Sequence, residues 1–164
     1  MTANTNVAAP KGGDRYRSAE KRLWNQWGLE PEERYIDLQS PSVRLRVVEV
    51  GSGPPVLFIP GTGGTGPYWA PLVRMMSGNR CLMLDRPGWG LSGPIDYSKY
   101  QYRSVVVDLV SGVLDSLGLE RAHLVGASIG NLWALRFAEH RPDRVEKIVL
   151  IGGGPNREIP VPTF

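Results

Sequence analysis

Residues 124–135 read LVGASIGNLWAL, and this stretch contains Gly126-Ala-Ser-Ile-Gly130 between an apolar run and a helical pattern. A G-x-S-x-G sequence in that setting predicts a very sharp strand-to-helix turn, with Ser128 in a strained backbone conformation and its hydroxyl exposed. Gly126 and Gly130 are glycines because side chains there would collide across the turn. The alternative is a plain strand–helix turn in which Ser128 only caps the helix.

The flanking sequence predicts an α/β protein. Continuous apolar runs, typical of strands buried on both faces, alternate with amphipathic helices, which indicates a mostly parallel sheet of about six strands. Residues 34–39 and 43–50 alternate apolar and polar side chains and are expected to form two half-buried, antiparallel N-terminal strands. The other expected strands cover 55–59, 80–84, 122–126 and 145–153, with helices over 69–76, 103–118 and 131–142.

The glycine-rich loop Gly61-Thr-Gly-Gly-Thr-Gly66 has two interpretations. Its glycines fit the G-x-G-x-x-G pattern of a dinucleotide-binding domain, and Asp85 at the end of the next strand would then bind a ribose. Pro67, Tyr68 and Trp69 oppose this, because a proline and two large rings fit poorly where the last glycine should allow close helix–strand packing. The loop could instead present backbone N–H groups to a substrate carbonyl.

Three segments together resemble the α/β-hydrolase family: FIPGTGG at 58–64, LDRPGWGLSGP at 84–94, and LVGASIGNLWAL. They resemble, in order, that family's oxyanion loop, its D-x-x-G-x-G-x-S loop and its nucleophile elbow. The resemblance runs from about Arg34 to Gly154. It implies a serine hydrolase acting on an ester or related acyl compound, with Ser128 as nucleophile. The backbone N–H groups of Thr62 and Ile129 would form the oxyanion hole. The family often has His-Gly where this chain has Pro60-Gly61.

The chain lacks a histidine that could act as the base for Ser128. His123 is about 16 Å away at strand rise, and His140 is about 18 Å away at helical rise. A general base needs about 3 Å. The resemblance places the missing acid and histidine after later strands, so the fold is expected to be truncated. Glu158 is a candidate for the acid, although a polar tail explains this residue equally well. The base would come from a missing C-terminal half or a second subunit.

Three other functions stay open. The chain could be a non-catalytic remnant or scaffold of the same fold, a relative of cofactor-free haloperoxidases or carbon–carbon bond hydrolases, or a dinucleotide-binding domain that uses GTGGTG. Tyr68, Trp69 and Trp89 are candidate pocket residues, although core or rim packing explains each equally well.

The expected organisation is a disordered arm over 1–14, an N-terminal helix over 15–30, the partial hydrolase domain over 32–155, and a tail over 156–164 where a cap would begin. The strand at 145–153 would form an apolar sheet edge, which is prone to association.

The composition limits the kinds of molecule that the chain is expected to bind. The net charge of +3 is spread along the chain, so a nucleic-acid partner is not expected. The single cysteine, Cys81, sits in an apolar strand and is expected to be a buried thiol. No metal-binding pattern, cofactor motif beyond the glycine loop, signal peptide or membrane span is visible. We therefore expect a cytoplasmic protein with a small-molecule acyl substrate and no cofactor.

Overall fold

A six-stranded mixed sheet organises the chain, and the computed structural model describes residues 13–152. The strands lie in the order β1-β2-β4-β3-β5-β6. β2 pairs antiparallel with both β1 and β4, whereas β3, β4, β5 and β6 run parallel to one another. Their bounds are β1 Glu32–Gln39, β2 Ser42–Val50, β3 Pro55–Ile59, β4 Arg80–Asp85, β5 Ala122–Ala127 and β6 Val145–Ile151. The expected α/β class, the strand count and the antiparallel N-terminal pair are confirmed.

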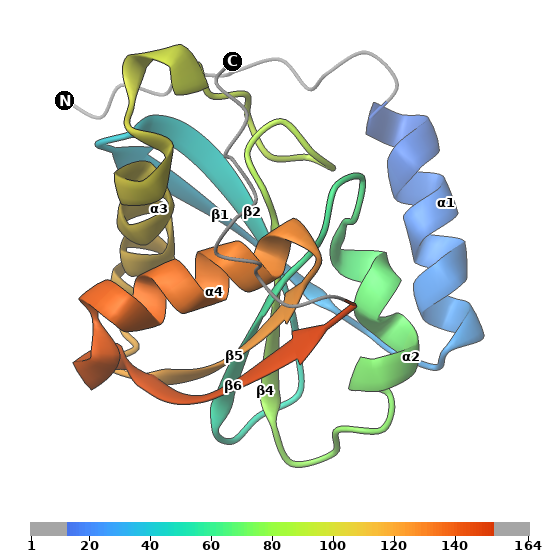
Figure 1. The fold of residues 1–164 in the computed structure, drawn as a ribbon. Helices are drawn as coiled ribbons and strands as arrows, with labels where there is room; N and C mark the ends of the chain where they lie inside the picture. Colours follow the sequence, from blue (N-terminus) through green and yellow to red (C-terminus); the bar gives the residue numbers. More distant parts are fainter. Residues whose placement is uncertain (1–12, 153–164) are drawn as a thin grey trace, which may run out of the picture.

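Helices cover both faces of the sheet (Figure 1). The long helices α3 Tyr102–Ser116 and α4 Ile129–His140 pack on one face, where their apolar side chains join those of the strands in the larger core cluster. The other face carries α1 Gly13–Gln26, the 3₁₀ turn η1 Gly66–Trp69 and the short α2 Ala70–Val73. Two further 3₁₀ turns, η2 Tyr97–Lys99 and η3 Pro142–Arg144, lie in the connections.

α3 forms where its apolar positions predict a helix. Val106, Leu109, Val110 and Val113 recur at helical spacing and are fully buried against the sheet. The helix ends before Gly118, which adopts a φ of +66°. Such a left-handed residue after a helix is most often glycine, because it has no Cβ to clash.

Three elements differ from the expected ones. α1 begins at Gly13, two residues earlier than the predicted helix, and ends at Gln26. The helix predicted over 69–76 is instead the η1 turn followed by α2, which leaves Leu72 and Met75 exposed. β2 is buried on both faces rather than half-buried, because α1 covers the face on which its polar residues lie.

β6 is an edge strand, as expected. It pairs with β5 on one side, and the sheet order places no described strand on the other. Val149, Leu150 and Ile151 are exposed. The expected arm and tail fall mostly on residues 1–12 and 153–164, outside the described residues. None of the helices described between residues 13 and 152 has the length and apolarity needed to cross a bilayer.

Candidate active site

Ser128 lies at the sharp turn between β5 and α4. Its backbone has φ 52° and ψ −118°, and among residues 13–152 it is the one non-glycine residue with positive φ. The residue is exposed, although the strand residues before it are buried. Its N–H donates to the Ile151 carbonyl at 3.1 Å, and its carbonyl accepts from the Asn131 N–H at 2.9 Å. These bonds hold the strained turn between the end of β6 and the first turn of α4.

The two glycines of the turn are required by space. A Cβ on Gly126 would lie 2.7 Å from the Gly130 oxygen, and a Cβ on Gly130 would lie 2.0 Å from the Ile59 oxygen. Real Cβ atoms do not approach backbone that closely, so a side chain at either position would force β3, β5 and α4 apart. The space at both positions is therefore compatible with glycine alone.

The glycine-rich loop 61–66 lies beside Ser128. β3 and β5 are adjacent and parallel, with Ile59 opposite Gly126, so the chain after each strand emerges at the same edge of the sheet. A Cβ on Gly61 would lie 3.1 Å from the Cβ of Ser128. Thr62, the next residue, is exposed at the same edge. Parallel α/β sheets commonly bind ligands at this edge.

Asp85 supports the loops and cannot bind a ribose. Its carboxylate is fully buried, and it accepts from the Gly66 N–H at 2.9 Å, the Leu91 N–H at 3.1 Å and Arg46 Nη1 at 3.0 Å. A Cβ on Gly90 would lie 2.2 Å from one of its oxygens. The carboxylate is thus committed to the glycine loop and to the loop after β4, which contradicts the dinucleotide interpretation.

Comparison with known proteins agrees with this geometry. A family model for the alpha/beta hydrolase fold matches residues 54–163. The chain belongs to this family. One relative is the 2-hydroxy-6-oxononadienedioate/2-hydroxy-6-oxononatrienedioate hydrolase of Paraburkholderia phymatum. The two sequences are 37% identical over 141 residues, which make up 79% of this chain and 49% of the relative.

The chain is also similar to a second hydrolase sequence and to a solved esterase structure. The 2-hydroxy-6-oxo-6-phenylhexa-2,4-dienoate hydrolase of Comamonas testosteroni is 37% identical over 111 residues, covering 65% of this chain and 38% of that protein. The crystal structure of carboxylesterase CesB from Bacillus subtilis superposes with a TM-score of 0.74 at 27% identity, over 86% of this chain and 50% of that one. The chain therefore spans about half the length of the α/β hydrolases that it matches.

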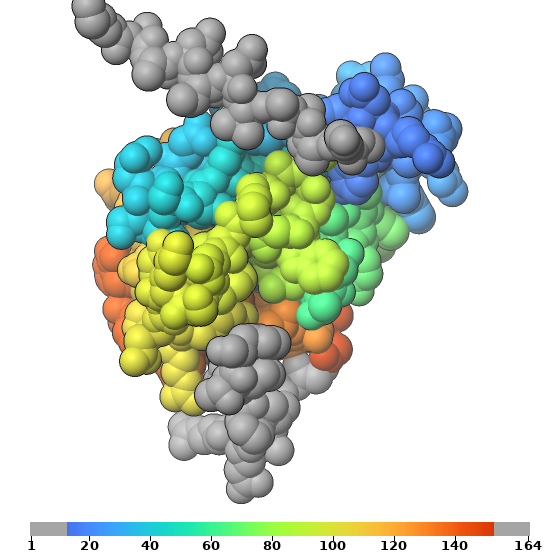
Figure 2. All heavy atoms as spheres, turned by 90° about the horizontal axis from the view of Figure 1, so that it is seen from above, coloured from blue at the N-terminus to red at the C-terminus, as the bar shows by residue number. Residues whose placement is uncertain are grey.

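The aromatic residues near the glycine loop divide into exposed and buried ones. Tyr68 is 61% exposed and Trp89 is 37% exposed, and a Cβ on Gly63 would touch the Trp89 ring at 3.8 Å. Trp69 is 2% exposed and packs on Phe58 with ring centroids 5.2 Å apart. Trp69 is therefore a core residue, whereas Tyr68 and Trp89 are surface residues. Figure 2 shows the segment after β4 (yellow-green) next to the segment after β3 (green) on the surface of the molecule.

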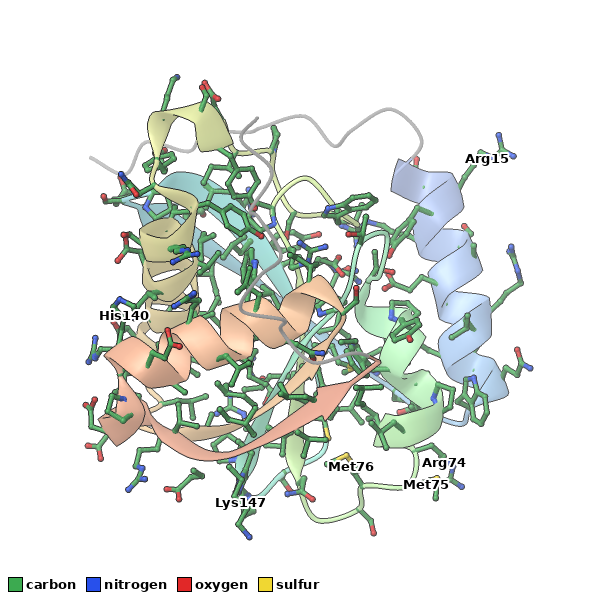
Figure 3. All side chains as sticks on the ribbon, in the orientation of Figure 1. Arg15, Arg74, Met75, Met76, His140 and Lys147 are labelled. Carbon is green, nitrogen blue, oxygen red and sulfur yellow. The ribbon has the colours of Figure 1, made fainter. Side chains whose placement is uncertain are left out.

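Neither histidine of the chain lies at the turn. His123 is near the start of β5, opposite Val56 of β3, whereas Ser128 follows the end of that strand. His140 is the last residue of α4, where its ring Nδ1 lies 2.9 Å from the Arg136 carbonyl oxygen, and Figure 3 shows it at the outer end of the helix. Both imidazoles therefore lie far from Ser128, because His123 is near the start of β5 and His140 is at the end of α4.

Sequence reasoning missed a buried arginine beside the glycine loop. Arg86 follows β4 directly, is 5% exposed, and donates from Nη2 to the Gly61 carbonyl at 2.8 Å. Burial lowers the pKa of its guanidinium from the usual value. The D-x-x-G-x-G-x-S resemblance directed attention to the aspartate and the glycines of this loop, and nothing in the local pattern distinguishes Arg86 from a surface arginine.

Proposed function

We propose that this chain carries the nucleophile and the oxyanion hole of a serine hydrolase. The observation that supports this most directly is the conformation of Ser128, an exposed residue with positive φ between a buried strand and the first turn of α4. Strained, non-glycine residues persist where the surrounding structure holds them, and they cluster at functional sites. The relatives named above are hydrolases, which agrees with this chemistry.

In the proposed step, Ser128 Oγ attacks a substrate carbonyl carbon, and the carbonyl oxygen gains the negative charge. The backbone N–H groups of Ile129 and Thr62 would bind that oxyanion. Ile129 is the first residue of α4, whose initial N–H groups have no intrahelical partner and carry the positive end of the helix dipole. Gly61, whose peptide unit carries the Thr62 N–H, lies close to Ser128, since a Cβ built on it would be 3.1 Å from the Ser128 Cβ.

The proton of the Ser128 hydroxyl must pass to a base. Both histidines of the chain lie away from Ser128, and a serine hydroxyl is a weak nucleophile without a base. We therefore propose that the base and its orienting acid come from another polypeptide segment or subunit. If no base can activate Ser128, the chain has a non-catalytic role.

The proposed substrates are esters or related acyl compounds. The structural similarity to a carboxylesterase supports this class. A second candidate, cleavage of a carbon–carbon bond next to a ketone, is favoured by the two 37%-identical relatives, whose names specify 2-hydroxy-6-oxo-dienoate substrates. Both reactions pass through an oxyanion on the attacked carbonyl carbon, so both can use the same site. Release of p-nitrophenol from a short ester and loss of dienoate absorbance would distinguish the two.

The test is covalent labelling of the full chain by a fluorophosphonate probe, with and without added imidazole as an external base. We expect slow labelling that imidazole accelerates and that Ser128→Ala abolishes. Ser116→Ala is the matched control, because Ser116 is exposed at the end of α3, and it should label like the original chain. Absence of labelling under both conditions would show that Ser128 is not an activatable nucleophile and would favour a scaffold.

A further inference from the structure

Arg86 is a buried cation that has no acidic partner among residues 13–152. Its side chain donates to the Gly61 carbonyl, and its Cζ lies 5.6 Å from the centroid of the Trp133 ring. Its Nε has no hydrogen-bond partner within the described part of the chain. No carboxylate forms an ion pair with it in the part of the chain that the structure describes. Arginine stays protonated in proteins, so a positive charge is held at this point next to the glycine loop.

The comparison with Arg46 shows how unusual this arrangement is. Arg46 is 2% exposed, and its guanidinium pairs with the carboxylates of Glu20 and Asp85 at 2.7 and 3.0 Å. A buried charge without such partners is destabilising, because it loses its hydration and gains little in return. Loop anchoring alone could be achieved by a neutral donor. The retained charge at Arg86 therefore indicates a task beyond packing.

The carbonyl that Arg86 binds belongs to the peptide unit whose N–H is the proposed oxyanion donor. In a planar trans peptide the C=O and the N–H point in opposite directions. The Gly64 N–H also donates to the Gly61 carbonyl, at 3.1 Å. Arg86 and Gly64 together therefore fix this carbonyl, and with it the Thr62 N–H, which points away from both donors. Gly61 lies close to Ser128, since a Cβ built on this glycine would be 3.1 Å from the Ser128 Cβ.

Charge also affects the strength of that N–H as a donor. A charged donor on a carbonyl forms a stronger hydrogen bond than a neutral one, and hydrogen bonds in a chain polarise one another. The guanidinium on the Gly61 carbonyl thus makes the Thr62 N–H a better donor.

We propose that Arg86 is a positioning residue that orients and polarises the Gly61–Thr62 peptide so that its N–H faces the oxyanion formed at Ser128. The catalytic part of this inference rests on the proposed function, whereas the orientation of the peptide does not. Arg86 itself need not contact substrate. Its effect should appear wherever a negative charge develops on the attacked oxygen.

The kinetic test compares two phosphonylating reagents that differ only in a P=O or P=S group. Sulfur accepts hydrogen bonds poorly, so the P=S reagent depends little on an oxyanion hole. We expect Arg86→Met to slow labelling of Ser128 by the P=O reagent about tenfold to a hundredfold, somewhat less than the effect of deleting a donor directly, and to slow the P=S reagent far less. Arg86→Lys, which keeps the charge but not the planar fork, should lie in between. Equal slowing of both reagents would overturn the proposal.

The second test does not need a reactive serine. In the folded full chain, NMR should show the Gly61 carbonyl carbon and the Thr62 amide shifting in Arg86→Met. Arg144→Met is the matched control, because Arg144 donates to the Glu120 and Leu119 carbonyls at 2.6 and 2.8 Å in a different region, and it should move neither resonance. Unchanged Gly61 and Thr62 resonances in Arg86→Met would refute the positioning role. If the original chain is not labelled at all, the proposed function fails, while shifted resonances would still support the oriented peptide.

Discussion

At the scale of single residues, the backbone of Ser128 is the feature from which the rest of the site follows. A φ of 52° with a ψ of −118° is unfavourable for any residue with a Cβ, and such conformations cost on the order of 1–3 kcal/mol. The turn is held by the close packing of Gly126 and Gly130 against neighbouring backbone and by the hydrogen bonds of the Ser128 backbone to Ile151 and Asn131. The strain therefore comes from the packing of the turn and is independent of the chemistry of the hydroxyl.

This strain predicts an order of stability for two variants that both remove the hydroxyl. Ser128→Gly should be more stable than Ser128→Ala by about 1 kcal/mol, because only glycine adopts this conformation without a Cβ clash. Urea unfolding at neutral pH measures the difference. At Ser116, in the last turn of α3, the order should reverse, since alanine is favoured over glycine in helices. The same order at both positions would contradict a strained turn.

At the scale of elements, the sequence predicted strands and helices well where local periodicity decides them. α3, the parallel strands and the turn at Ser128 follow from apolar spacing and from glycine positions. β2 was predicted to be half-buried because its residues alternate, yet Arg46 on its polar face is 2% exposed. Its burial depends on α1, which lies far away in sequence, so no local pattern could reveal it. The helix over 69–76 was predicted too long for a related reason. The spacing of apolar residues does not indicate where a helix stops packing against its neighbours.

The exposed edge of β6 predicts that the chain associates with itself. Its outer edge has no described neighbour, and Val149 is 52% exposed. Exposed apolar edge strands pair with other chains, and natural proteins suppress this with lysine. We expect concentration-dependent association and ANS binding by the chain, and both should fall in Val149→Lys. Met75→Lys, at a residue 81% exposed beyond α2, should leave them unchanged. A monomer with low ANS binding would contradict this prediction.

At the scale of the whole molecule, the candidate site depends on contacts between distant segments. The motif at Ser128 and the glycine loop were visible in the sequence because each is short and continuous. The contacts that hold them were not, because Arg46 joins Glu20 of α1 to Asp85 of β4, and Asp85 in turn binds the N–H groups of Gly66 and Leu91. Ion pairs between residues of different helices and strands produce no periodic pattern in the sequence, so they cannot be predicted from it.

This network gives the last prediction. Arg46→Met would leave Glu20 and Asp85 buried without a cation, and breaking a buried ion pair in this way costs about 3–5 kcal/mol. The loss should also loosen the glycine loop, so the Gly66 and Leu91 amides, which donate to Asp85, should exchange faster with solvent. Arg44→Met is the matched control on the same strand, since the Arg44 side chain is 44% exposed and its ion pair with Asp37 is 3.7 Å long. That variant should lose at most about 1 kcal/mol. Equal losses at the two positions would mean that α1 and the loops are held by apolar packing alone.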